Sequence, residues 1–484
     1  MKNLISVPVI FCSLLCVGQN EVDALRYSQN TFGGTARFVS MGGAFGALGG
    51  DVSALSFNPA AIGIYRKTEL TFSPSVFTQK TTSTYNGSTV SDSKTNFNFG
   101  NGGIVLSTGS RNNQSDENKG WMNVNFGFGY NRTNNFNNRT SISGINQNSS
   151  MLDTYVGSAN GLSPSSLDQF SNYLAWMTYL IDTIPGDPTH YKSAIPAGTA
   201  LQQKKSIETS GSSGETFITV GGNYGNKLYL GATVGFPHIT YNETSSYDET
   251  DYRDSVKSSF KSYNYTSSVS TKGSGFNLKM GMIYRATDWF RFGLAVHTPS
   301  SFTMSDNYSS KITFIHDNGE STSSSSPSGS FNYRLTTPMK VIGSLGFVIA
   351  KKGIVGIDYE MVDYSSATLS STPNVFSDQN TTIRKNYKTA NNLRAGIEWR
   401  VDPFSIRAGY AYYGSPYQTG INTDASRMSY SAGFGIKEDG YFIDFAYVLT
   451  QYSENYYLYD PSLVSPAKNT MRSSSFMVTL GFRY

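Results

Sequence analysis

Alternation at the end of the chain constrains the fold more than any other feature. In residues 475–484, Phe476, Val478, Leu480, Phe482 and Tyr484 occupy every second position, and Met477, Thr479, Gly481 and Arg483 lie between them. A β-strand with one apolar face has this period of two, whereas a helix has a period near 3.6. Because an unpaired charge is costly in a dry core, the arginine on the second face indicates a wet interior. The segment predicts a strand between lipid and water.

The same pattern returns along the chain from about residue 67. Clear examples are residues 227–241, 392–400, 404–413 and 441–451, and further strands begin near residues 69, 95, 121, 215, 275, 289, 339, 354 and 428. Together with residues 475–484, these segments give about fourteen strands. An even number is what single-chain bacterial outer-membrane barrels have.

Composition favours a membrane barrel over other classes of protein. Only 15% of residues are charged, yet Ser, Thr, Asn and Gly keep the mean hydropathy polar, and no apolar run is long enough for a transmembrane helix. A closed barrel also satisfies its backbone in lipid, and it needs an apolar residue only at every second position. We therefore predict an all-β fold, a transmembrane antiparallel β-barrel over residues 67–484 in the bacterial outer membrane.

Connections between the predicted strands are alternately short and long. Short ones lie at residues 226–227, 286–288, 351–353, 402–403 and 439–440, and long polar ones at residues 242–270, 298–330 and 365–388. Residues 111–119 form a longer member of the short set. Outer-membrane barrels have short periplasmic turns and long extracellular loops. This order predicts that both chain termini are periplasmic.

The first residues have the features of an export signal. Lys2 is followed by an apolar stretch over residues 4–17, and small residues precede Gln19. This predicts a signal peptide over residues 1–18. Both cysteines, Cys12 and Cys16, fall within it. The mature chain is then expected to have no disulfide, thiolate metal site or cysteine nucleophile.

Residues 33–65, between the signal and the first strand, are rich in Gly and Ala and contain few charges. They have too few large side chains for a core of their own and are too apolar for a linker. We predict that residues 19–66 form a plug, or hatch, inside the barrel lumen, with glycines that allow close contact with the wall.

One long connection has a helical rather than an alternating pattern. In residues 163–184, Leu167, Phe170, Leu174, Met177 and Leu180 recur at spacings of three and four. An amphipathic loop helix should pack over the barrel mouth to cover its apolar stripe. It is either a lid resting on neighbouring loops or a surface where a hydrophobic ligand first lands.

Charged residues fall on the predicted lumen face of several strands. Examples are Arg394, Glu398, Arg407 and Asp444. Such residues suit a polar-solute porin, which is one alternative function. The four histidines show no catalytic or metal-binding spacing, so no catalytic residue, metal or cofactor is predicted. The net charge of +4 is dispersed, which argues against nucleic-acid binding.

Several blocks of sequence resemble the FadL/TodX-type transporters of hydrophobic compounds. They are the small-residue run at 41–51, the Asn58-Pro59-Ala60 triplet, the strand-turn-strand segment at 275–302, and residues 405–417 and 433–447. The resemblance spans nearly the whole mature chain. It implies a fourteen-stranded barrel with an N-terminal hatch, and uptake of fatty-acid-like or aromatic molecules with lateral release.

The resemblance also implies candidate site residues. Phe45, Leu48, Asn58, Pro59 and Ala60 are expected to form the hatch side of a ligand pocket. Asn58 and Pro59 also fit an Asx-Pro turn that simply ends the hatch.

Family members release substrate through an opening at a kinked strand. The candidates here are Gly100, Gly102 and Gly103, then Gly127 and Gly129, and Pro237. Each glycine equally suits relief of crowding in a curved wall.

Two other functions remain open besides hatch-gated uptake. They are the polar-solute porin and a surface receptor or adhesin built on a plugged barrel. The expected partners are a hydrophobic small molecule, outer-membrane lipid and lipopolysaccharide, and the barrel-assembly machinery, with the protein acting as a monomer.

Overall fold

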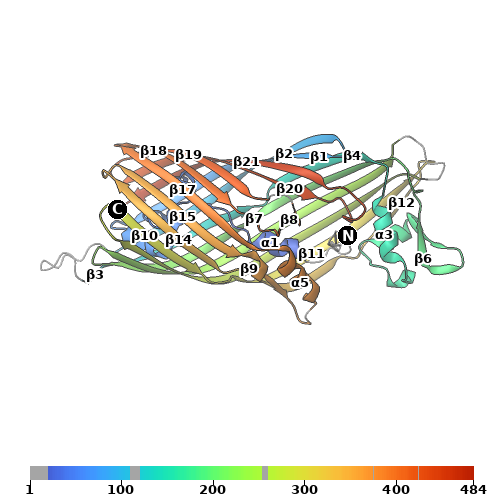
Figure 1. The fold of residues 1–484 in the computed structure, drawn as a ribbon, viewed down its shortest axis with the longest axis horizontal. Helices are drawn as coiled ribbons and strands as arrows, with labels where there is room; N and C mark the ends of the chain where they lie inside the picture. Colours follow the sequence, from blue (N-terminus) through green and yellow to red (C-terminus); the bar gives the residue numbers. More distant parts are fainter. Residues whose placement is uncertain (1–19, 109–119, 253–259, 374, 423–424) are drawn as a thin grey trace, which may run out of the picture.

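A computed structural model describes residues 20–108, 120–252, 260–373, 375–422 and 425–484. The predicted signal peptide, with both cysteines, and the connection at residues 111–119 lie outside these residues. The described chain forms one long antiparallel barrel with helices inside it and at one end, as Figure 1 shows.

Strands make up the whole wall. They are β1 (Glu69–Tyr85), β2 (Ser88–Ser107), β3 (Trp121–Asn135), β4 (Asn138–Asn146), β7 (Leu201–Tyr224), β8 (Leu228–Asp251), β9 (Phe260–Arg285), β10 (Phe290–His297), β11 (Ser301–His316), β12 (Ser321–Ser325), β13 (Gly329–Thr336), β14 (Lys340–Ile349), β15 (Gly353–Asp363), β16 (Thr368–Ser370), β17 (Thr389–Val401), β18 (Phe404–Tyr413), β19 (Arg427–Lys437), β20 (Tyr441–Tyr456) and β21 (Ala467–Arg483).

Some labelled strands are parts of one longer strand. This applies to β3 with β4, β10 with β11, β12 and β13 with β14, and β15 with β16. The wall therefore has fourteen strands, and β21 pairs with β1 to close it. The predicted fold class is confirmed, because the barrel is closed and antiparallel and has its N-terminal segment within.

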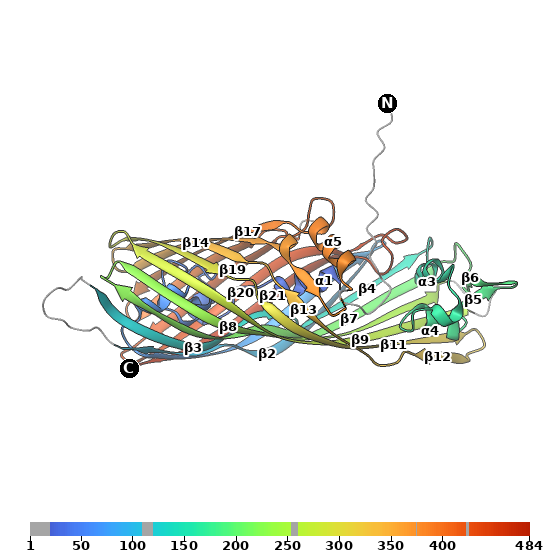
Figure 2. The same cartoon turned by 90° about the horizontal axis from the view of Figure 1, so that it is seen from below.

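The short connections also agree with the prediction. Strands β7 and β8, β9 and β10, β14 and β15, β17 and β18, and β19 and β20 are each joined by two to four residues. The long connections differ from it. Much of residues 242–270 and 298–330 extends β8, β9, β11 and β13 beyond the apolar band, so one side of the barrel is much taller (Figure 2). Outside lipid these strands need no apolar face, which is why alternation failed to show them.

The tall end is covered by a cap. It contains α3 (Met151–Ala159), the turn η3 (Pro164–Ser166), α4 (Asn172–Met177) and the hairpin of β5 (Ile181–Ile184) and β6 (Asp187–Ser193). In both views it lies at the end of the barrel opposite the C-terminus. A single helix over residues 163–184 is therefore wrong. Thr178 ends α4, Tyr179 then adopts a left-handed backbone with φ of 63°, and the chain continues as a strand.

The segment before β1 lies inside the barrel. It contains α1 (Glu21–Ser28), α2 (Ala36–Ser40), η1 (Val52–Ser56) and η2 (Pro59–Ile64), and we call residues 20–66 the hatch. Its apolar side chains form a buried cluster with wall residues such as Phe217, Ala446 and Met477. Side-chain caps begin each of the four elements, at Asn20, Thr35, Asp51 and Asn58.

Glycines of the wall let the hatch backbone lie directly against it. A Cβ at Gly231, Gly281, Gly293, Gly356, Gly396 or Gly409 would collide with hatch residues 41–60. Several of these positions are opposite one another in neighbouring strands, as Gly356, Gly396 and Gly409 are. They form a row at one level of the lumen, and only a residue without a side chain leaves room there.

The two ends of the described chain lie at different heights. Helix α1 lies beside α5 (Ser377–Asn386), which follows the short turn η4 (Tyr364–Ser366), and Tyr387 donates a hydrogen bond to the carbonyl of Glu21 (2.9 Å). Tyr484 lies at the opposite end, with the short turns (Figure 1). From the height of α1 the hatch runs down the lumen to β1. The periplasmic placement of both termini stays a prediction.

Helices of the described ranges are all too short or too polar to cross a bilayer.

Candidate ligand site between the hatch and the barrel wall

A cavity of about 150 Å³ lies between the hatch and one sector of the wall. On the hatch side it is lined by residues 31–34 and Val39. On the wall side its lining includes the apolar side chains Phe77, Val448 and Met477 and many hydroxyl and amide groups. It has room for a small molecule, or for part of a longer one, in contact with both hatch and wall.

Two arginines line this cavity, and no aspartate or glutamate does. Arg427 donates to Oε1 of Gln29 (2.6 Å), and its guanidinium lies 4.6 Å from the ring centre of Tyr452. Arg132 donates from Nε to the carbonyl of Phe99 (3.1 Å). Within the described chain neither guanidinium is ion-paired with a carboxylate. The cavity therefore has a positive lining, although the buried carboxylate of Glu454 behind it interacts electrostatically with Arg427.

The wall beside the cavity is not closed by backbone hydrogen bonds. Strand β2 pairs with β3 only from Asn101 to Ser107, so its residues 88–99 pair with β1 alone. The ladder stops at Gly100, an extra residue that shifts the register with β1 between Ser73 and Pro74. Pro74, opposite Phe99, has no amide hydrogen to donate. We call this unpaired boundary between β2 and the β3–β4 strand the seam.

Side chains bridge the seam where the backbone does not. Ser141 of β4 donates to Asp92 of β2 (2.8 Å). Lys94 of β2 reaches the carbonyl of Thr209 (2.8 Å) and the carboxylate of Glu208 (3.0 Å) on β7. These bonds run between flexible polar side chains, so they hold the strands less rigidly than a backbone ladder would.

Aromatic rings lie in a row just below the end of the ladder. Phe72, Phe99, Tyr130 and His238 belong to β1, β2, β3 and β8, and successive ring centres are 5.1, 5.7 and 5.6 Å apart. Nearby Phe97 is 75% exposed. The seam therefore begins at the upper edge of the apolar band that faces lipid.

The hatch contacts the wall at the same height. Thr31 donates from both its amide nitrogen (2.8 Å) and its hydroxyl (3.1 Å) to the carbonyl of Thr133. Thr133 is free to accept because the register of β3 with β7 shifts between Arg132 and Asn134. The hatch thus has a direct hydrogen-bonded link to the strand that borders the seam.

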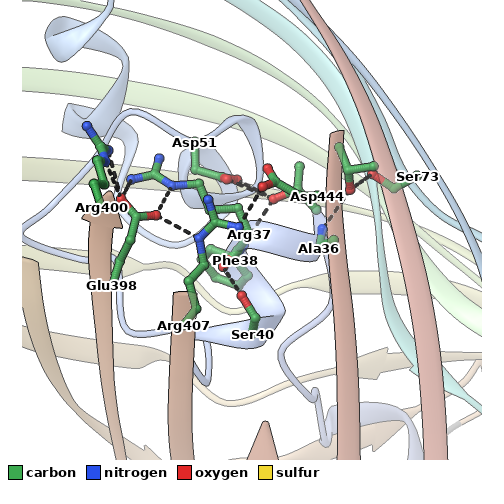
Figure 3. A network of polar contacts seen from close by, with 12 residues as sticks. Ala36, Arg37, Phe38, Ser40, Asp51, Ser73, Glu398, Arg400, Arg407 and Asp444 are labelled. Atoms are coloured by element: carbon green, nitrogen blue, oxygen red, sulfur yellow. Dashed lines mark hydrogen bonds and ion pairs between the residues drawn. The ribbon is translucent and has the colours of Figure 1, made fainter. Parts of the chain in front are cut away.

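The predicted lumen charges attach the hatch to the other side of the barrel (Figure 3). Arg37 of the hatch and Arg407 of β18 both bind Glu398 of β17 (2.7 Å each). Arg407 also binds Asp444 of β20 (2.6 Å), and Arg400 binds Glu398 (2.7 Å). We call these five residues the hatch clamp. They bind one another and do not line an open pore.

The remaining lumen arginine, Arg394, is 1% exposed. Its guanidinium binds Glu360 (3.1 Å) and lies 3.9 Å from Asp358. Asp358 in turn accepts a hydrogen bond from the amide of Gly46 in the hatch (3.2 Å). Arg394 therefore supports the hatch through Asp358 of β15.

The predicted hatch residues are buried against the wall. Phe45 packs on Phe38, and Leu48 lies against Gly356. Asn58 caps η2 and also donates to the carbonyls of Gly46 (2.6 Å) and Met282 (3.2 Å). Its position therefore agrees with both earlier interpretations, a turn that ends the hatch and a contact with the wall.

Pro59 and Ala60 follow Asn58 and pack against Gly231 of β8. None of the five predicted hatch residues lines the 150 Å³ cavity. Their role in ligand binding stays a prediction.

The predicted landing residues divide between the inside and the outside of the cap. Leu167 and Leu174 are buried in its core, which includes Tyr247 and Phe314 of the wall. Phe170 is half-buried against Tyr308, and Met177 is 44% exposed. Most of the apolar stripe is thus covered, as expected of a lid.

A second interruption lies elsewhere in the wall. The β10–β11 strand breaks at residues 298–300, and the neighbouring β13–β14 strand breaks at residues 337–339. A cavity of about 40 Å³ behind it is lined by residues that include Pro237, Lys279 and Lys340. Here hydroxyl groups replace the ladder, because Thr298 Oγ1 accepts from Leu278 (3.0 Å) and Thr337 Oγ1 accepts from Ser300 (3.0 Å).

Sequence reasoning did not identify the arginines of the cavity. Arg132 had a usable signal, because it continues the apolar face of Phe126, Phe128 and Tyr130, where a charge is out of place. Arg427 begins a strand after a polar connection and has no such signal. Across the described residues, no group of three or more His, Cys, Asp or Glu side chains is placed to hold a metal ion.

Solved outer-membrane channels have the same fold. A FadL homologue from Pseudomonas aeruginosa is 13% identical with a TM-score of 0.60, covering 94% of this chain and 99% of that chain. The toluene transporter TodX of Pseudomonas putida is 10% identical with a TM-score of 0.54, covering 94% and 99%. The toluene transporter TbuX of Ralstonia pickettii is 14% identical with a TM-score of 0.50, covering 95% and 100%. No curated protein matches the chain.

At such identities the structures show a shared fold and nothing more. Family membership comes from the sequence itself, since the profile of one outer-membrane family matches residues 227–483, more than half of the chain. The resemblance inferred from the sequence blocks is thereby confirmed. The chain belongs to the outer membrane protein transport protein family (OMPP1/FadL/TodX).

Proposed function

We propose that this protein takes up hydrophobic small molecules that carry an acidic group. The observation that carries the proposal is the cavity between hatch and seam, which combines apolar side chains with two arginines and no carboxylate. A neutral hydrocarbon would leave Arg132 without an anionic partner in a confined site, and Arg427 with the electrostatic interaction of Glu454 alone. A carboxylate provides that partner, and it accepts two parallel N–H bonds from a guanidinium.

The route we propose ends in the membrane rather than below the barrel. The hatch fills the lumen under the cavity, whereas the seam opens the ladder beside it at the edge of the lipid-facing band. Gly100 is therefore our candidate for the kink that the sequence suggested. Glycines 103 and 127 lie against Val52 and Leu55 of the hatch, so they have a different role.

A polar-solute porin is the weaker alternative. The charges that favoured it are paired with one another or with the hatch, so they offer little to a passing solute. We place the cap outside the cell and the short turns in the periplasm, as barrels of this kind have them. We retain the proposals of a monomer in contact with outer-membrane lipid and lipopolysaccharide and inserted by the barrel-assembly machinery.

Binding and uptake of matched probes test the proposal. Purified protein in detergent micelles should bind dodecanoate more tightly than 1-dodecanol, and Arg427→Gln should remove roughly tenfold of the dodecanoate affinity, about 1.4 kcal/mol. Proteoliposomes should take up dodecanoate faster than toluene. Equal affinity for acid and alcohol, with no effect of Arg427→Gln, would remove the acidic group from the proposal.

A further inference from the structure

The side chains of Asn101 and Arg132 hold the end of the β2–β3 ladder, and Asn101 does so by donating to Oδ1 of Asn131 (2.6 Å). Beyond the last pair, Asn101 with Asn131, the next bond across the boundary is from Nε of Arg132 to the carbonyl of Phe99. This carbonyl belongs to the residue before the extra Gly100, where β2 leaves its partner. The bond therefore takes the place of the first missing bond of the ladder.

Arg132 also lies on the path between cavity and lipid. Alternation places it on the outward face, after Phe128 and Tyr130, yet it lines the inner cavity together with Asn98 and Gly100. A solute that leaves the cavity through the gap must pass it. We propose that Arg132 is a ligand-competed latch, which holds the seam through Phe99 until the acidic group of a substrate takes over its guanidinium. This rests on the proposed function.

The chemistry of the two acceptors supports this exchange. The Phe99 carbonyl is neutral and receives one hydrogen bond from Arg132. A carboxylate is charged and binds a guanidinium through two parallel bonds, which are stronger than a bond to a neutral carbonyl. Phe99 is also opposite Pro74 of β1, which has no amide hydrogen to donate, and its ring contacts Phe72 and Tyr130. None of these contacts is a hydrogen bond that would fix its carbonyl. Gly100 gives the backbone freedom to move once the carbonyl is released.

The latch makes opening depend on the substrate's head group. An acid opens the seam as it leaves the cavity, whereas an alcohol of the same length has no charge with which to displace Phe99. Opening and recognition are then functions of one residue. Arg427, the other arginine of the cavity, bonds to Gln29 of the hatch and not across the seam, so it contributes to affinity alone.

Spin labels across the seam test the latch in the whole protein. Asn96 and Asn135 face each other across it (3.5 Å between Oδ1 and Nδ2) and are suitable labelling sites as cysteines. Dodecanoate should lengthen the distance between the labels, and 1-dodecanol at equal occupancy should not. Arg132→Gln keeps a hydrogen-bond donor but no charge, so neither probe should change the distance between the labels in this variant. Arg132→Lys should restore part of the response to dodecanoate.

Arg139→Gln is the matched control. Arg139 is also next to the seam, on β4, but it binds Glu208 across an intact ladder (2.9 Å), and Glu208 keeps its bond to Lys94 across the seam when Arg139 is replaced. Its removal should leave the response to dodecanoate unchanged. The latch is disproved if dodecanoate binds without moving the labels, if dodecanol moves them equally, or if Arg132→Gln still responds to the acid. Failure of dodecanoate to bind the unaltered protein overturns the proposed substrate instead, and the latch with it.

Discussion

The barrel wall is interrupted in two places that differ in how the backbone is satisfied. At the β10–β11 and β13–β14 breaks, Thr298 and Thr337 each donate from the amide and accept through the hydroxyl, so the ladder is rebuilt within one or two residues. At the seam the ladder ends at Asn101 and does not resume along β2. One interruption is repaired, and the other is bridged only by side chains.

This difference indicates where the wall can move. Backbone bonds between adjacent strands break cooperatively, whereas long polar side chains separate one at a time. The hatch also contacts the seam through Thr31 and Thr133, and among the described residues no such backbone bond joins it to the repaired breaks. We conclude that a proline or glycine in a strand marks a gate only where no other group replaces the lost backbone bonds.

Deleting the hatch should have the largest effect, because it removes both the filling of the lumen and the support of the hydrogen-bonded contact with the seam. Without residues 33–61 the lumen loses its buried core, so a planar bilayer should show open channels where the intact protein conducts poorly. Specific uptake of dodecanoate should fall, since the cavity loses its inner lining. If deletion changes neither conductance nor uptake, the segment is not a plug and the porin or adhesin interpretation gains.

Deleting Gly100 should make the seam more like the repaired interruption, in which backbone hydrogen bonds continue across the break. Removal of this extra residue restores the register of β2 with β1 and aligns Phe99 with β3. Two restored ladder bonds would stabilise the closed wall by about 2 kcal/mol, a roughly thirtyfold fall in the open population. Dodecanoate uptake in proteoliposomes should drop accordingly while binding persists. Deletion of Gly87, in the β1–β2 turn, is the control and should leave uptake near normal.

Replacing Glu398 tests the hatch clamp separately from the contact of the hatch with the seam. Glu398→Gln leaves Arg37 and Arg407 without their shared carboxylate, and breaking a buried ion pair costs about 3–5 kcal/mol. The heat-modifiable gel shift should move to lower temperature. Arg400→Gln removes a partner whose side chain is 43% exposed, so it should cost less than about 1 kcal/mol. Equal effects of the two changes would show that the clamp does not hold the hatch.

The sequence predicted the membrane half of this molecule better than the outer half. Within lipid, alternation is enforced by the environment, so residues 475–484 predict β21 without further help. Outside lipid, the Ser- and Thr-rich parts of β8 and β9 obey no such rule and were interpreted as loops. The short α4 was overextended because its apolar spacing continues past Tyr179, whose backbone ends the helix.

The candidate site was less predictable than the fold because it depends on register. Only pairing shows that Asn101 is the last ladder residue of β2 and that Thr31 contacts Thr133. Three other wall glycines carried a signal that sequence reasoning did not use. Gly356, Gly396 and Gly409 belong to three different strands and lie at one height. That common height indicates a surface of the wall against which the hatch backbone packs.

The smallest expected effect tests the repaired interruption itself. Thr298→Val keeps the shape of the side chain and removes the hydroxyl that accepts from the amide of Leu278. Leu278 lies on the lipid-facing side of the wall, where water is absent and an unsatisfied amide costs about 1–3 kcal/mol. The folded barrel should lose stability by about that amount in urea titrations. Thr298→Ser retains the hydroxyl and should recover most of it. Uptake should be unchanged in both, because this region of the wall does not open. If Thr298→Val instead increases dodecanoate uptake, the repaired break is a second gate that its hydroxyls keep closed, and the contrast with the seam is one of degree.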